Sequence, residues 1–325
     1  MSGVVIFLPS VVLSDETSLA DRRREFPRLA GCLGASTRAP HTGPLEPMLA
    51  ACCGLTADFA LARITALYDL ACPAPAPDLL RSDPVHLHAD PNKVLVYGPN
   101  QLELSAAEAD DLLGSLQQEF PALGWQRGTA PTRWYIQRPA EVAGIAPSAQ
   151  WLSGRSITPF MPLAAPQRAW RRWLNDLQMV LHENPVNLAR VRRGLPAING
   201  VWWFGGGGEL IPGACPFTQL IGNDVLLAGL ARQTGLAWQS QARPELGLAA
   251  AGDVLMVAGT AFGEATTEDL ISLAEIEMQW LPKLVSALRR GRLRALTFVT
   301  ATHRARLSWW QSWQRWRPPQ SFKVE

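Results

Sequence analysis

The chain of 325 residues is 47% hydrophobic and 18% charged, a composition that can bury a sizeable core. It therefore excludes a chain that is disordered throughout. Thirty basic residues against 28 acidic ones give a formal net charge of +2, which is too small to indicate nucleic acid or an anionic membrane as the partner.

The cysteines favour a reducing compartment. Their number is odd, and they show neither a CxxC pair nor the Cys/His spacing of a zinc site. In a chain of this length we expect reduced thiols in a soluble, cytoplasmic protein. The neighbours Cys52 and Cys53 are either a redox pair or, as we favour, small buried residues. The five cysteines are Cys32, Cys52, Cys53, Cys72 and Cys215.

The N-terminal part predicts a strand followed by helices. Residues 4–8 are apolar and β-branched and are followed by Pro9, which is typical of a buried strand. The apolar run there covers about ten residues without a basic lead, so it fits neither a signal peptide nor a membrane span. Helical patterns follow at 21–35 and 55–70, and four prolines at 72–84 predict a linker.

A change of pattern after this linker predicts a small inserted α+β domain at 81–139. Ser105, followed three residues later by Glu108, forms a capping box, so a helix should begin there and run to Phe120. Two strands joined by turn residues precede this helix, and one strand follows it. The strands are expected at 85–89, 94–97 and 132–137.

From Trp151 onward, predicted strands and helices alternate. This order favours an α/β fold with a largely parallel sheet and helices on both faces. The core would then comprise 1–80 and 140–325, with the inserted domain between them. Helices are expected at 166–182, 223–234 and 267–290, and strands at 200–204, 254–258 and 293–300.

Tryptophans gather near the C-terminus beside several arginines. Their spacing of three and four residues would place Trp309, Trp313 and Trp316 on one face of a helix. We expect this segment, as a helix or a strand, to seal the core. The alternative is a face that binds a protein partner, because aromatic residues and arginine dominate interface hot spots. Stacking of nucleic-acid bases is disfavoured because no basic domain surrounds the segment.

The most informative stretch is 182–208, HENPVNLARVRRGLPAINGVWWFGGGG. Asn187 and Arg190 are three residues apart and should share one helix face, and both side chains can grip a phosphate or carboxylate. Asn199 then precedes a strand that ends in four glycines. Glycines after a strand let backbone N–H groups approach a ligand oxygen closely. The alternative is a plain chain reversal beneath a sheet.

This stretch resembles the N-P-[IV]-N-x-x-R, G-x-P-x-x-N and G-x-G run of archaeal-type cofactor-independent phosphoglycerate mutases, members of the alkaline phosphatase superfamily. Other segments resemble their first helix (FPRLAGCLGAS) and their inserted domain (VHLHADPNKVLVYGPNQLELSAAEA). The resemblance implies an alkaline-phosphatase-like core. Within the group the chain looks like the bacterial RpfE-type regulatory proteins. The enzymes of the family bind two divalent metals and use a Ser nucleophile to move a phosphoryl group on glycerate.

The chain departs from these enzymes where the family places its metal ligands. Pro9 and Ser10 stand in place of the Asp-Gly that ends the first strand, and proline offers no ligand atom. The final Asp-His pair aligns with Thr302 and His303, and the Arg before the glycine loop is replaced by Phe204. Two divalent cations need several carboxylates to offset their charge. We therefore expect neither a metal nor another cofactor.

The leading hypothesis is a non-catalytic member of this family with a binding or regulatory role. It would keep a pocket for an anion, such as a small phosphorylated metabolite, made of gripping groups without the metals. The residues of this pocket would be Asn187, Arg190, Asn199, Gly205, Gly206 and Gly207.

Two alternatives stay open. One is an active phosphoryl-transfer enzyme, a mutase or phosphatase with relocated catalytic groups. Thr56 or Asp58 near the nucleophile's position, together with His303, would then carry the chemistry. The other is an interaction protein that docks a partner through the tryptophans of the C-terminus.

Overall fold

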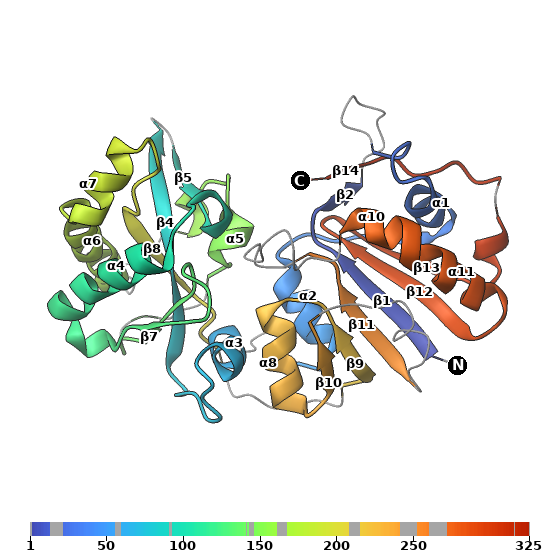
Figure 1. Ribbon diagram of the computed structural model, residues 1–325, viewed down its shortest axis with the longest axis horizontal. Helices are drawn as coiled ribbons and strands as arrows, with labels where there is room; N and C mark the ends of the chain where they lie inside the picture. The colour runs from blue at the N-terminus through green and yellow to red at the C-terminus, as the bar shows by residue number, and fades with distance from the viewer. Residues whose placement is uncertain are drawn as a thin grey trace. The chain divides into compact units, whose positions relative to one another are not determined.

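The computed structural model folds as two compact units (Figure 1). Unit 1 combines Met1–Gly54, Pro212–Ala261 and Ala265–Glu325, whereas unit 2 is formed by Leu55–Ile211 with Phe262–Glu264. The structure describes residues 2–13, 22–55, 60–90, 93–140, 142, 146–160, 168–207, 215–240, 252–259, 272–314 and 316–324.

Unit 1 is built on a sheet whose described strands follow the order β10-β9-β11-β1-β12-β13-β3. The strands from β10 to β12 run parallel, and β13 and β3 add an antiparallel edge. β1 is central, with Val4 opposite Val254 on one side and Leu296 on the other. Its near-continuous apolar sequence is typical of a strand buried on both faces. The strands are β1 Ser2–Leu8, β3 Thr37–Pro40, β9 Phe217–Ile221, β10 Ala237–Gln239, β11 Asp253–Val257, β12 Leu293–Thr300 and β13 His303–Ser308.

Helices cover both faces of this sheet (Figure 1). On one face, Ile6 and Phe298 belong to the same apolar cluster as Leu284 of α11. On the other face, Met48 of α2 and Thr297 of β12 line one hollow. The predicted α/β fold with a largely parallel sheet and helices on both faces is therefore confirmed. The helices are α1 Pro27–Ala35, α2 Leu45–Cys52, α8 Val225–Thr234, α10 Leu273–Glu275 and α11 Leu281–Arg289, with a π-helical turn η5 Ile276–Trp280 and a 3-10 turn η6 Gln311–Trp313.

Unit 2 contains an antiparallel sheet centred on the long strand β4. Residues 79–81 of β4 pair with β7, residues 81–85 with β8, and residues 86–90 with β5. The short strand β6 pairs with β7. The strands are β4 Leu79–Asp90, β5 Lys93–Tyr97, β6 Gln126–Arg127, β7 Trp134–Gln137 and β8 Gly200–Phe204.

The helix predicted from the capping box is confirmed in unit 2. The Oγ atom of Ser105 accepts the backbone N–H of Glu108 at 3.3 Å, and the Glu108 carboxylate accepts the backbone N–H of Ser105 at 3.0 Å. Leu112 and Leu116 of this helix share an apolar cluster with Trp203 of β8. The helices are α3 Leu61–Asp69, α4 Ala106–Glu119, α5 Ala149–Leu152, α6 Arg168–His182 and α7 Pro185–Arg192, with 3-10 turns η1 Pro99–Gln101, η2 Pro121–Leu123 and η3 Thr158–Phe160.

Unit 2 extends well beyond the insertion expected at 81–139. Strand β8 pairs with β4, and α6 contributes Trp170 and Leu177 to the same apolar cluster as α4. The chain up to Ile211 therefore belongs to unit 2 and not to the core. Local periodicity predicts these elements but does not reveal which sheet they join. Within the described part of the chain, no helix combines the length and apolarity needed to cross a bilayer.

Candidate functional site

Residues 182–207 form a compact helix–loop–strand in unit 2. Asn184 caps helix α7 by accepting the backbone N–H of Val186 at 2.9 Å, and Pro185 occupies the first helical position. Asn187 and Arg190 are both buried, so the predicted shared face of the helix is confirmed. This face points into the interior of unit 2 and not to solvent.

Asn187 uses its amide to close the loop after α7. Its Nδ2 donates to the carbonyl oxygens of Leu181 at 2.6 Å and Ile198 at 2.7 Å, and its Oδ1 accepts the backbone N–H of Ile198 at 2.7 Å. The side chain therefore ties the end of α6 to the segment that enters β8. All three partners of the Asn187 side chain are backbone groups of unit 2.

Arg190 is fully buried and donates to three different segments. Nε donates to the carbonyl of Pro196 at 3.0 Å, Nη1 to the carboxylate of Glu108 at 3.0 Å, and Nη2 to the carbonyl of Leu102. Burial by itself raises the pKa of Glu108, but hydrogen bonds from Ser105 and the charge of Arg190 outweigh it, so the pKa is lowered. The guanidinium is thus engaged as an internal brace.

Asn199 and Gly205 also serve the packing of unit 2. Asn199 extends the sheet, because its Oδ1 accepts the backbone N–H of Leu87 at 2.7 Å and its Nδ2 donates to the Leu87 carbonyl at 2.9 Å. Gly205 has a φ of 76°, and a Cβ atom there would lie 3.0 Å from the backbone nitrogen of Ala62. Gly206 and Gly207 are half-buried after β8. The side chains expected to grip an anion therefore hold the unit together.

Of the residues considered as catalytic groups, the structure describes only His303. Thr56 and Asp58 lie outside the described residues. His303 begins β13, opposite Pro40, and its Nδ1 lies 3.0 Å from the hydroxyl of Thr302. Thr302 in turn accepts the backbone N–H of Leu13 at 3.1 Å.

Three positions that the resemblance aligns with metal ligands and their helper arginine carry other residue types. Pro9 lies in the turn directly after β1, and Thr302 supplies a hydroxyl where a carboxylate is expected. Phe204 is buried, with its ring centroid 5.4 Å from the guanidinium carbon of Arg81. Across the described ranges, no three His, Cys, Asp or Glu side chains gather so as to hold a metal ion.

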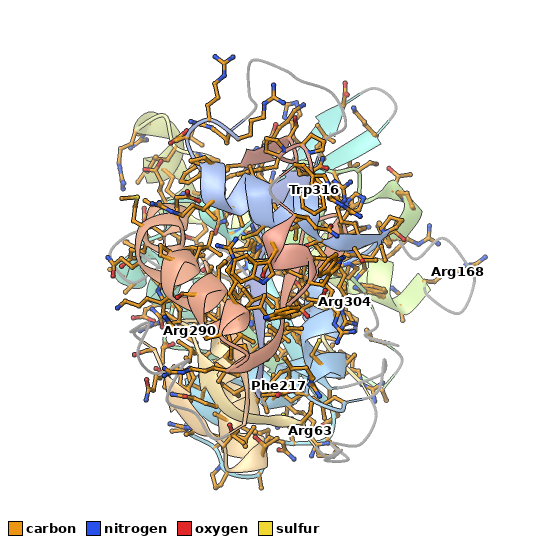
Figure 2. The ribbon with its side chains drawn as sticks, turned by 90° about the vertical axis from the view of Figure 1, so that its right-hand side faces the viewer. Arg63, Arg168, Phe217, Arg290, Arg304 and Trp316 are labelled. Carbon is orange, nitrogen blue, oxygen red and sulfur yellow. The ribbon has the colours of Figure 1, made fainter. Side chains whose placement is uncertain are left out.

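The C-terminal tryptophans of unit 1 are exposed, which corrects the expectation that they seal the core. Exposed fractions are 48% for Trp309, 62% for Trp310, 48% for Trp313 and 72% for Trp316, which is labelled in Figure 2. The expected helix is limited to the 3-10 turn η6. The core is sealed instead by Phe322 in strand β14 Phe322–Val324, which pairs with β2 Val11–Leu13.

Two of these tryptophans, Trp309 and Trp313, are held in place by each other and by an arginine. The rings of Trp309 and Trp313 meet edge to face, with centroids 6.4 Å apart. The guanidinium carbon of Arg289 lies 4.8 Å from the Trp313 ring centroid, and its Nε donates to the Ser312 carbonyl at 3.1 Å. The indole N–H of Trp309 donates to the backbone of Arg289 at 2.9 Å. The aromatic face is therefore anchored to α11.

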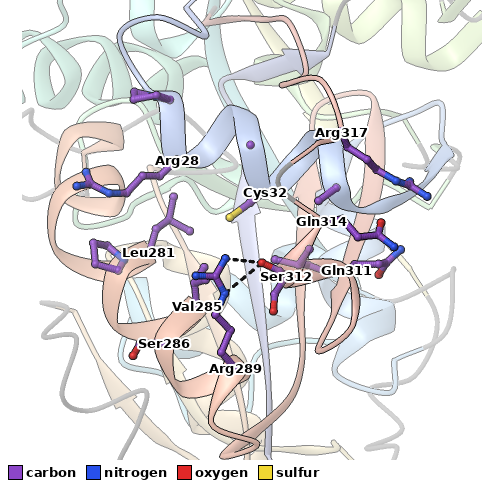
Figure 3. Close-up of a pocket in the computed structure, with 15 residues that line it drawn as sticks. Arg28, Cys32, Leu281, Val285, Ser286, Arg289, Gln311, Ser312, Gln314 and Arg317 are labelled. Atoms are coloured by element: carbon purple, nitrogen blue, oxygen red, sulfur yellow. Dashed lines mark hydrogen bonds between the residues drawn. The ribbon is translucent and has the colours of Figure 1, made fainter.

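A groove of about 470 Å³ lies beside this aromatic face (Figure 3). Its wall contains Arg28 of α1, Arg289 of α11 and Arg317, with Leu281 and Val285 as apolar floor residues. The lining includes no acidic residue, although the buried Glu277 lies 3.7 Å from Arg28 just outside it. Sequence patterns did not reveal this groove, because its residues come from three segments far apart along the chain.

Comparison with solved structures finds neighbours of low sequence identity, among them the following two. The PH0037 protein from Pyrococcus horikoshii shares 12% identity at a TM-score of 0.47, covering 94% of this chain and 87% of that one. The cofactor-independent phosphoglycerate mutase from Thermoplasma acidophilum DSM 1728 shares 13% identity at a TM-score of 0.39, covering 95% of this chain and 90% of that one. No protein-family model and no curated protein matches the chain. At this level of similarity, the neighbours assign it neither an activity nor a ligand.

Proposed function

We propose that this protein acts by binding a protein partner and not by phosphoryl transfer, with the C-terminal tryptophan face as the docking surface. The observation that carries the proposal is the exposure of Trp309, Trp310, Trp313 and Trp316 on one short, anchored segment. Leaving about half or more of each of these four side chains in water forgoes burial of apolar area worth about 25 cal/mol per Å². A partner that covers them would recover this free energy.

The chemistry of the groove favours an acidic segment with apolar side chains. Arg289 and Arg317 have no carboxylate partner among the described residues, and both line the groove next to the tryptophans. Acidic side chains of a partner would pair with these guanidinium groups. Its apolar side chains would rest on the indole rings, which are frequent hot-spot residues.

The loss of catalysis is supported by the residues at the family's metal positions. Pro9 has no ligand atom, and Thr302 replaces a carboxylate. The protein would then combine a phosphoglycerate-mutase-like fold with a regulatory role, as the resemblance to RpfE-type proteins implies. Turnover of a phosphate ester by protein supplied with Mn²⁺ or Mg²⁺ would instead support the enzyme alternative.

A peptide titration tests the docking surface. Two fluorescein-labelled peptides would share the same Leu and Phe residues but carry Glu in one and Lys in the other at every charged position. We expect fluorescence anisotropy to report micromolar binding of the Glu peptide, weakened by salt. The double variant W310S/W316S should bind roughly tenfold more weakly, as expected for loss of hot-spot residues.

The matched control is Met179→Ser, which removes an exposed apolar side chain from α6 in unit 2. It should leave the affinity for the Glu peptide unchanged. Equal binding by W310S/W316S and by the intact protein would contradict the proposal. Equal binding of the Lys peptide would contradict the charge complementarity.

A pocket for a small phosphorylated metabolite is the second candidate, favoured by a different hollow in unit 1. This hollow, of about 590 Å³, is lined by Thr297, Arg304 and Arg306 on the α2 face of the sheet. Arg304 and Arg306 have no ion-pair partner among the described residues. Isothermal titration with 2- and 3-phosphoglycerate checks this candidate, and an Arg304→Ala/Arg306→Ala variant should abolish any heat. Absence of heat with both compounds would argue against these two metabolites as ligands.

A further inference from the structure

The hollow of about 590 Å³ in unit 1 lies at the amino ends of the parallel strands. Phe217 and Asp253, which line it, are the first residues of β9 and β11, and Arg294 is the second residue of β12. Pro9 and Thr302, which the resemblance aligns with metal ligands, follow the carboxyl ends of β1 and β12 instead. Open α/β sheets usually bind ligands at those carboxyl ends, so this hollow is a separate place in the fold.

Two arginines of β13 face the hollow together. Side chains alternate along a strand, so Arg304 and Arg306 stand on one face of β13. Ala305 and Leu307 point to the other face, where they belong to the apolar cluster beneath α11. Both arginines line the hollow and are exposed to solvent. They can therefore reach an anion that enters from solvent.

The charge of these arginines is not cancelled within the hollow. Asp253 is the one acidic residue of the described lining. Its Oδ1 accepts the backbone N–H of Gly3 at 2.6 Å, and its Oδ2 accepts a hydrogen bond from Nη2 of Arg294 at 2.9 Å. Three arginines against this one carboxylate leave two positive charges in excess. A group with two negative charges would balance them.

The floor of the hollow is apolar. Phe217 and Ala295 are buried there, and Val5 and Met48 are half-buried. Among the buried side chains of the described lining, only Thr297 carries a polar atom. A ligand hydroxyl placed on this floor would lose its water and gain few partners, which costs free energy. An apolar group placed there would gain free energy from burial.

We propose that the hollow binds a phosphate monoester whose ester group is apolar. The phosphate, which carries nearly two negative charges at neutral pH, pairs with Arg304 and Arg306. The apolar group lies over Phe217 and Met48. The volume of about 590 Å³ is in the range of small-molecule sites. The inference rests on the second candidate function, because it names the ligand class of the same hollow, and it is independent of the tryptophan face.

Isothermal titration of the full chain with a series of alkyl phosphates tests the proposal. The series is ethyl, butyl, hexyl and octyl phosphate, each below the concentration at which it forms micelles. Affinity should rise roughly three- to fourfold for each methylene that is buried on the floor. By contrast, 3-phosphoglycerate should bind no more tightly than ethyl phosphate, because its hydroxyl and carboxylate find no partners on the floor.

Three variants separate the head of the ligand from its tail. Arg304→Ala/Arg306→Ala should weaken octyl phosphate at least roughly tenfold, because charge-assisted hydrogen bonds to the phosphate are lost. Met48→Gln, of similar size but polar, should weaken octyl phosphate roughly fivefold and leave ethyl phosphate unchanged. The matched control is Arg290→Ala, at an exposed arginine that follows α11 and is labelled with Arg304 in Figure 2. It should change neither affinity.

The outcomes distinguish this inference from the second candidate function. Equal affinity along the series, or 3-phosphoglycerate binding as tightly as octyl phosphate, would overturn the inference and leave the second candidate standing. No heat with any of the compounds would overturn both. Vesicles that contain phosphatidic acid should not bind, because the bilayer keeps the apolar chains away from the floor. Binding to vesicles without binding of octyl phosphate would also overturn the inference.

A thiol provides a readout in the intact protein, should the double arginine variant fail to fold by circular dichroism. Cys52 lines the hollow and is partly exposed, whereas the partly exposed Cys72 belongs to unit 2. Octyl phosphate should slow the labelling of Cys52 by N-ethylmaleimide and leave that of Cys72 unchanged, as measured by peptide mapping. Equal rates at Cys52 with and without octyl phosphate would contradict binding in this hollow.

Discussion

Two regions of the molecule invert the roles that their residue types suggest. The stretch 182–207 in unit 2 is rich in Asn and Arg, which are typical ligand-binding residues, yet their donors turn inward to backbone carbonyls and Glu108. The tryptophans at 309–316 in unit 1 are typical core residues, yet about half or more of each side chain faces solvent. Residue type alone thus gives a poor guide to function, and the partners of each side chain decide.

The largest expected effect on stability comes from removing the buried guanidinium of Arg190. Arg190→Ala should lower the free energy of unfolding of unit 2 by about 3–5 kcal/mol, because it leaves the buried carbonyls of Leu102 and Pro196 without their donor and removes the ion pair with Glu108. Denaturation in urea measures this change. Arg193→Ala is the matched control, since Arg193 also contacts Glu108 but is largely exposed, and it should cost less than about 1 kcal/mol. An equal loss of stability in the two variants would contradict the role of Arg190 as a buried structural residue.

Asn187→Ala should have the next largest effect. It removes three hydrogen bonds from buried backbone groups and should lower the free energy of unfolding by about 2–3 kcal/mol. The control is Asn175→Ala, at an exposed position on α6, which should change stability by less than about 0.5 kcal/mol. A ligand that binds Asn187 directly would instead make the variant lose affinity while keeping its stability.

The acid dependence of unit 2 tests the same inward network at Asp69. Burial alone raises the pKa of Asp69, but Arg133, whose Nε lies 2.7 Å from the carboxylate, outweighs it, and the net pKa is lowered. A lowered pKa stabilises the fold above the unfolded value of about 3.9, and that stability is lost as pH falls through the folded pKa. Urea midpoints measured from pH 6 downward should therefore fall in acid. Asp69→Asn should start lower and show a shallower decline, and an unchanged slope would contradict the assignment.

The smallest expected effect on stability belongs to the tryptophans. Trp310→Ser should shift the free energy of unfolding by no more than about 0.5 kcal/mol, because its ring is mostly exposed. Thermal unfolding followed by circular dichroism measures this shift. A loss of about 3 kcal/mol or more is typical of a buried aromatic residue and would show that Trp310 belongs to the core.

Local signals were sufficient to predict several elements. The capping box at Ser105 and Glu108 involves two residues three apart, and the strand at 4–8 follows from its apolar run, so both are legible in the sequence. Helix α10 begins after the capping box of Ser272 and Glu275, whereas the sequence predicted a helix from 267, a position outside the described residues. Strands β3 and β13 escaped prediction because they form an antiparallel edge through long-range pairing.

The candidate site was less predictable, for physical reasons. Arg190 looked like an anion ligand, but its partners at Leu102 and Glu108 lie more than 80 residues away along the chain. The periodicity of apolar residues along the sequence does not predict such long-range contacts. The groove beside the tryptophans likewise depends on three distant segments.

The position of β1 at the centre of the parallel sheet has a consequence for synthesis on the ribosome. Its partners are Val254 of β11 and Leu296 of β12, both made after the segment Leu55–Ile211 that builds most of unit 2. Because domains fold as their residues emerge, unit 2 can complete its fold while the apolar strand at the N-terminus still waits for both neighbours. The nascent chain therefore exposes an aggregation-prone segment for most of its translation, and chaperone binding at residues 3–8 is the expected safeguard.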